Sequence, residues 1–187
     1  MKNALLLCLM KQREVTRRTC NAGVSKMSDK IKKYIIEGNY QLAESVCNKM
    51  NSSDVYNTLL TLAYDTESIC IYSFIQYMIS NTNEALWIKL AIEVMIIPLC
   101  HIEGAYSAAL FHARELLKLE YNAANLEMVL FFYDIPDKLI KKSEAESIAK
   151  ELQRIDPDNK VALHILSGCS WTQLNTNGKD SQTDLKG

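Results

Sequence analysis

The chain has 187 residues, 48% of them apolar, with only 6 Gly and 3 Pro, which excludes a collagen-like or disordered chain and is typical of a helix-rich globular domain. The net charge of −1 hides an uneven distribution: residues 1–26 carry +5, whereas residues 51–137 carry −8, with three Lys or Arg against eleven Asp or Glu. Such an acidic centre disfavours nucleic-acid phosphates and favours a basic partner, although an acidic surface kept for solubility would have the same composition.

The amino-terminal segment has an apolar run at residues 4–10, which basic residues follow at once. This run is too short to span a membrane, and no small-x-small cleavage site follows it. Met27 stands directly before the first expected helix. We therefore expect residues 1–26 to be an extension outside the fold, from an upstream start codon, with a weak signal peptide as the alternative.

From Ser28 onward, apolar residues recur at helical spacing between short polar joints. Gly38 ends the first stripe, and Asn51 to Asp54 form a polar cluster suited to capping the following helix. The helices expected in this half lie at about residues 28–38, 42–50, 55–63 and 67–80.

Residues 84–100 form the most apolar part, with Glu84, Lys89 and Glu93 as their only charges. Lys89 and Glu93 are spaced as an i,i+4 pair on one helix face. The charges, the length and Pro98 predict a buried central helix rather than a membrane helix.

Residues 102–119 are the strongest amphipathic segment, and shorter helices are expected at about 126–133, 143–155 and 161–166. Ser143 and Glu146 have the spacing of a capping box. After Ser167 the chain becomes polar, which predicts a flexible tail over 169–187. No stretch alternates as strands do, so the sequence predicts an all-α domain over residues 27–168.

A short Gly-x-Tyr-x-x-Ala pattern occurs twice, as Gly38-x-Tyr40-x-x-Ala43 and as Gly104-x-Tyr106-x-x-Ala109. The copies are 66 residues apart, which is two periods of 33. That period is typical of a helix–turn–helix solenoid, whose units bury their apolar faces by stacking.

These marks resemble tetratricopeptide (TPR) repeats, in which Gly-x-Tyr-x-x-Ala opens the second helix of each unit. Ala145, Ala149 and Pro157 fit a further unit, whereas the unit near residues 71–76 lacks the Gly and Tyr marks. The resemblance covers residues 30–166 and implies a TPR-like right-handed array of helical hairpins with about nine helices. In such an array Tyr40 and Tyr106 are structural marks.

The segment Pro98–Tyr106, continued by Phe111–Arg114, is similar to small bacterial TPR-like immunity proteins encoded beside polymorphic or contact-dependent growth-inhibition toxins. This resemblance implies non-covalent capture of one toxin domain, often a basic nuclease, whose active site would be occluded. A general TPR-type peptide-binding adaptor is the alternative. The residues expected to contact the partner lie at helix ends and joints, where each could equally be a cap or a solvated charge: Asp65, Glu67, His101, Glu103, Tyr133, Asp134 and Asp137.

A catalytic interpretation finds little support in the sequence. His101 and Glu103 could perform acid–base chemistry, but no nucleophile or glycine-rich loop accompanies them. His112 is expected at the boundary of the core, and His164 has no partner in the sequence. We therefore expect no enzymatic activity, no cofactor and no metal.

The six cysteines have no zinc or disulfide spacing. Cys47, Cys70 and Cys100 lie in apolar stretches, where a free thiol packs as a small apolar group. Reduced cysteines and a cytoplasmic location follow as expectations.

Overall fold

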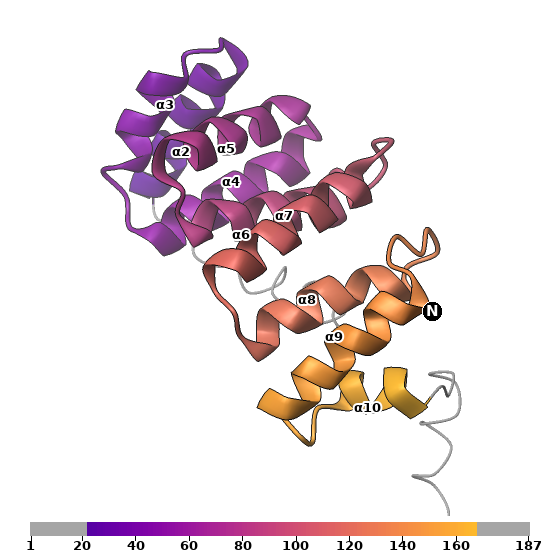
Figure 1. The fold of residues 1–187 in the computed structure, drawn as a ribbon. Helices are drawn as coiled ribbons and strands as arrows, with labels where there is room; N and C mark the ends of the chain where they lie inside the picture. The colour runs from indigo at the N-terminus through magenta and orange to yellow at the C-terminus, as the bar shows by residue number, and fades with distance from the viewer. Residues whose placement is uncertain (1–21, 168–187) are drawn as a thin grey trace, which may run out of the picture. The chain divides into compact units, whose positions relative to one another are not determined.

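A computed structural model describes residues 22–167, which form nine α-helices without a strand (Figure 1). The all-α prediction and the predicted number of helices are confirmed for this part of the chain. The helices group into two compact units that meet in sequence between Tyr121 and Asn122. The predicted tail at 169–187 and most of the predicted extension at 1–26 lie outside the described residues.

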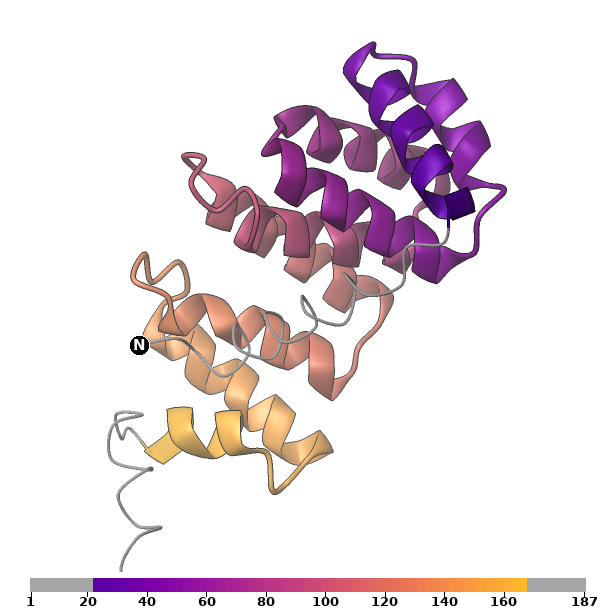
Figure 2. The same ribbon diagram turned by 180° about the vertical axis from the view of Figure 1, so that it is seen from behind.

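The first unit contains six helices, joined by short turns. Each hairpin packs its two helices together, and α4 also packs on α2 and α6 (Figures 1 and 2). The helices are α2 (Ala22–Ile36), α3 (Tyr40–Cys47), α4 (Ser52–Thr66), α5 (Ile69–Thr82), α6 (Ala85–Ile96) and α7 (Ala105–Leu119).

The second unit contains α8 (Ala123–Asp134), α9 (Lys142–Ile155) and α10 (Lys160–Ser167). Within it α9 packs on both α8 and α10. Asn122 caps α8, because its side chain accepts a hydrogen bond from the Asn125 amide.

The two glycines of the repeated pattern make the turns that precede α3 and α7. Gly38 and Gly104 have φ angles of +74° and +79°, a region that other residues enter at a cost. At Gly38 the backbone forms a Schellman motif, in which the Gly38 amide donates to the Ile35 carbonyl and the Asn39 amide to the Tyr34 carbonyl. The pattern therefore marks the end of one helix and the start of the next.

The alanines of the pattern are buried between the helices. Ala43, Ala109 and Ala145 are fully buried in α3, α7 and α9. Ala113 and Ala149, one turn further on, are buried as well. Side chains of this size let neighbouring backbones approach, and α7, which carries Ala109 and Ala113, packs along α6.

The unit without glycine and tyrosine marks is built around α5, with Ile71 and Ile75 buried where the other second helices carry alanine. Phe74 links this helix to its neighbours. Its ring lies 5.7 Å from that of Tyr40 on α3 and 6.2 Å from that of Trp87 on α6. The Tyr40 ring thus contacts α5 from α3.

The expected central helix α6 is buried on nearly every side, and Lys89 is its one exposed residue between Trp87 and Ile96. Pro98 follows its end. None of the helices between residues 22 and 167 combines the length and the apolar character that crossing a membrane requires.

Two local predictions are wrong. Helix α9 begins at Lys142, so Ser143 lies inside its first turn and cannot cap it, and Lys141 occupies the cap position without a side-chain bond. Cys100 is exposed, because it lies in the turn after α6 rather than in the helix, whereas Cys47 is buried as expected.

Glu67 ends α4 in the left-handed region, with a φ of 47°, where a side chain crowds the backbone. Replacing Glu67 with glycine is expected to raise the free energy of unfolding by about 1 kcal/mol. Asn83 ends α5 with a φ of 52°, and asparagine tolerates this region. Urea denaturation should therefore show a smaller gain for Asn83→Gly, and an equal gain at both positions would contradict the argument.

Candidate functional site

Four of the seven residues predicted to contact a partner lie on one edge of the first unit. Asp65 is in the last turn of α4, Glu67 follows that helix, and His101 and Glu103 lie in the joint between α6 and α7. The turns after α4 and α6 lie on the same side of this unit (Figures 1 and 2). We call Asp65, Glu67, His101 and Glu103 the acidic loop edge; all four are exposed.

The carboxylates of the acidic loop edge have no ion-pair partner among the described residues. For Asp65 and Glu67 the sequence explains why, since no Lys, Arg or His occurs between Lys49 and Lys89, which frame the α4–α5 hairpin. Three carboxylates without an ion-pair partner among the described residues thus lie on one side of the first unit, and their field extends into solvent.

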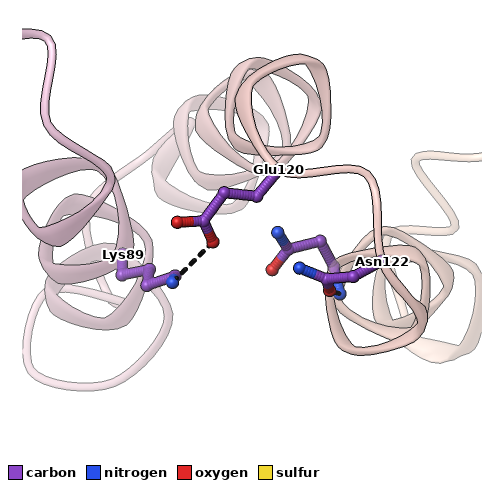
Figure 3. Close-up of polar contacts among 4 residues, drawn as sticks. Lys89, Glu120 and Asn122 are labelled. Atoms are coloured by element: carbon purple, nitrogen blue, oxygen red, sulfur yellow. Dashed lines mark hydrogen bonds and ion pairs between the residues drawn. The ribbon is translucent and has the colours of Figure 1, made fainter.

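Most other acidic residues of the −8 region are engaged within the fold. Lys89 Nζ lies 2.8 Å from Glu120 Oε2, as Figure 3 shows, and Lys118 Nζ lies 2.5 Å from Glu115 Oε1. The predicted pairing of Lys89 with Glu93 is therefore wrong. Lys89 reaches across to the end of α7, while Glu93 is turned into the protein.

The remaining three predicted contact residues belong to the second unit. Tyr133 and Asp134 form the end of α8, and Asp137 lies in the joint before α9. Asp134 and Asp137 are exposed, and Tyr133 is half-buried. These three residues therefore lie at the end of α8 and in the joint before α9. The other four lie at the end of α4 and in the joint between α6 and α7.

Glu93 is a buried carboxyl that the sequence did not reveal. It lies on α6, is 5% exposed, and accepts a hydrogen bond from the Tyr56 hydroxyl on α4. Burial raises the pKa of Glu93, against the opposing effect of the Tyr56 hydrogen bond. Burial first, and then the Glu93 charge, raise the pKa of Tyr56. The contact ties the first helices of two successive hairpins together.

His112 forms a second buried polar contact, between α5 and α7. Only 2% of this residue is exposed, and its Nε2 lies 2.9 Å from the Tyr72 hydroxyl and 2.7 Å from Gln76 Nε2. An Nε2 that accepts from the Gln76 amide carries no proton. Burial lowers the pKa of His112 to about 4, although the Glu115 charge acts in the opposite direction. The expectation of a boundary histidine is thus wrong, because α5 covers its ring.

These two contacts lie inside the protein, so we assign them to the stability of the fold rather than to ligand binding. The Glu93 carboxyl and the His112 imidazole are each hydrogen-bonded to side chains of a neighbouring helix. Buried polar groups that are bonded in this way specify which helices pair. Across residues 22–167, the His, Cys, Asp and Glu side chains form no group of three or more that could hold a metal ion. The acidic loop edge is therefore the candidate binding site of the first unit.

No family model, no curated protein and no solved structure matches the chain.

Proposed function

We propose that this protein is a non-enzymatic binding protein that captures a basic protein domain on its acidic loop edge. The observation that carries the proposal is the set of exposed, uncompensated carboxylates of Asp65, Glu67 and Glu103 on one side of the first unit. Such a surface accelerates encounter with a cationic partner and repels nucleic acid.

The proposed partner is the catalytic domain of a bacterial toxin, with neutralisation by occlusion of its active site. Two observations support this class. The segment from Pro98 to Tyr106 resembles immunity proteins, and the same segment supplies His101 and Glu103 to the acidic loop edge. A nuclease domain has a basic substrate cleft, which an acidic edge complements in charge.

A peptide-binding adaptor is the alternative function, and the charges favour it less. An adaptor that holds a peptide carboxylate through charge needs Lys or Arg side chains aimed at it. The α4–α5 hairpin lies at the centre of the first unit and has no basic residue. The proposed partner is therefore a folded basic domain rather than an acidic peptide end.

The direct test is co-expression with the domain encoded immediately upstream of this gene. If that domain is toxic alone, cells that also produce this protein should survive, and the purified proteins should form a complex. Death of the co-expressing cells, or an upstream gene for a kinase, regulator or secretion component, would overturn the toxin assignment.

Charge reversal then tests the surface. The triple variant Asp65→Lys, Glu67→Lys, Glu103→Lys should associate about 10- to 100-fold more slowly at low salt, because electrostatic steering acts on the on-rate. The control carries the same charge change at three exposed carboxylates elsewhere: Asp29→Lys, Glu84→Lys and Asp158→Lys. Stopped-flow or biolayer measurements that show equal slowing in both variants would contradict a specific edge.

A further inference from the structure

A carboxylate and two tyrosine rings lie together where α3 packs on α5, and neither the acidic loop edge nor the two buried polar contacts include them. Glu44 Oε2 on α3 accepts a hydrogen bond from the Tyr77 hydroxyl on α5, at 2.9 Å. The Tyr40 ring on α3 lies 5.5 Å from the Tyr77 ring, at an interplanar angle of 56°. All three side chains are half-buried, so each is partly accessible to solvent. We call Tyr40, Glu44 and Tyr77 the α3–α5 cluster.

The negative charge of Glu44 has no ion-pair partner among residues 22–167. The Tyr77 hydroxyl bonds to it without neutralising it. That hydrogen bond is the main cause that raises the pKa of Tyr77, so the phenol keeps its proton and the charge stays on Glu44. The faces of the two rings are negative as well, because the π-electrons lie above and below each ring plane. The α3–α5 cluster therefore attracts a cation.

The chemistry of the cluster selects one kind of cation. A carboxylate offers about four lone-pair positions, and the Tyr77 hydroxyl uses one of those on Glu44. A guanidinium can donate two parallel N–H bonds to the carboxylate, and its flat face stacks on aromatic rings. The ammonium of lysine is compact, strongly hydrated and without a planar face, and a quaternary ammonium has no N–H to donate. Only a guanidinium uses both the carboxylate and the rings in full.

We propose that the α3–α5 cluster binds an arginine side chain of a protein partner, whose guanidinium pairs with Glu44 and stacks on the tyrosine rings. The acidic loop edge acts by attraction over a distance, which does not distinguish arginine from lysine. The α3–α5 cluster combines two short-range contacts to one planar cation and thereby makes this distinction. The inference does not rest on the proposed function, because it involves none of the residues of the acidic loop edge.

Nuclear magnetic resonance of the full chain with isotope-labelled tyrosine rings tests the site, with N-acetylarginine amide as the probe. The chain has 9 tyrosines, and Tyr40→Phe and Tyr77→Phe identify the two relevant signals by their loss. These signals should shift saturably, with a roughly millimolar dissociation constant. N-acetyllysine amide, which has the same charge, should bind about threefold more weakly. Equal binding of the two probes, equal shifts at all tyrosines, or no saturable shift would overturn the proposal.

Glu44→Gln tests the carboxylate, because its amide oxygen can still accept from the Tyr77 hydroxyl while the charge is removed. Binding of N-acetylarginine amide, followed at the Tyr40 signal, should weaken about tenfold. Asp158→Asn is the matched control, since it removes the same charge from an exposed side chain of the second unit and should bind like the natural chain. Equal weakening in both variants, or none in Glu44→Gln, would contradict the site. Should Glu44→Gln lose helical circular dichroism, the comparison of the two probes on the natural chain decides.

Discussion

Replacing Phe74 with alanine is expected to lower the free energy of unfolding by about 3–5 kcal/mol. The ring is 0% exposed and joins three helices of the first unit through its contacts with Tyr40, Tyr77 and Trp87. The substitution removes the apolar contacts and leaves a cavity between helices that cannot close independently. Urea or guanidinium denaturation followed by circular dichroism measures the change.

Phe111 offers a control of the same chemistry. Its side chain is 58% exposed on α7, so Phe111→Ala should change the free energy of unfolding by less than about 0.5 kcal/mol. A similar loss for the two variants would show that Phe74 is not the link between helices that its contacts indicate.

Acidification should destabilise the fold through His112. Its pKa is about 4 in the folded protein and near 6.5 when exposed, so the unfolded chain binds a proton more readily in this range. Above pH 6.5 proton binding at this residue does not change the free energy of unfolding. It falls by up to about 3 kcal/mol as the pH drops from 6.5 to 4.

Glu93 acts in the opposite direction, because its pKa is raised by burial. Its stabilising contribution is fully present below the pKa of an exposed glutamate and is lost as the pH rises through the higher folded value. The His112 effect is therefore measured as the difference between the natural protein and His112→Gln at each pH, a comparison that cancels the contribution of Glu93.

The pH profile of the free energy of unfolding should be flatter for His112→Gln than for the natural chain between pH 4 and 6.5. Identical profiles for the natural chain and this variant would contradict a neutral, buried His112.

The helices could be predicted from the sequence because their signals are local. Apolar spacing, the glycines at 38 and 104 and the asparagine at 51 act within one turn of the residues they influence. The start of α9 was missed by one residue because Ser143 has the residue type of a cap, while the packing of the helix sets its first turn. Boundaries of this kind depend on neighbours that are distant in sequence.

The buried polar contacts could not be predicted, because their partners lie far apart in the chain. Tyr56 and Glu93 are separated by 37 positions, and Tyr72 and His112 by 40. Only the packing of successive hairpins reveals that Glu93 lies inside and that Lys89, one turn away, lies outside. The joints that hold the acidic loop edge were accessible from sequence, since polar residues between apolar stripes mark the ends of helices.

The stretch without lysine or arginine between Lys49 and Lys89 has a consequence for how a complex could be mapped. Amine-reactive cross-linkers have no attachment point in the α4–α5 hairpin, and trypsin releases it as one long peptide. A carbodiimide, which joins carboxylates directly to amines, suits the chemistry of this hairpin instead. The carbodiimide would link Asp65 and Glu67 directly to lysines of a basic partner. Because trypsin does not cut within the hairpin, a protease that cleaves after glutamate is then needed to locate the linked residues.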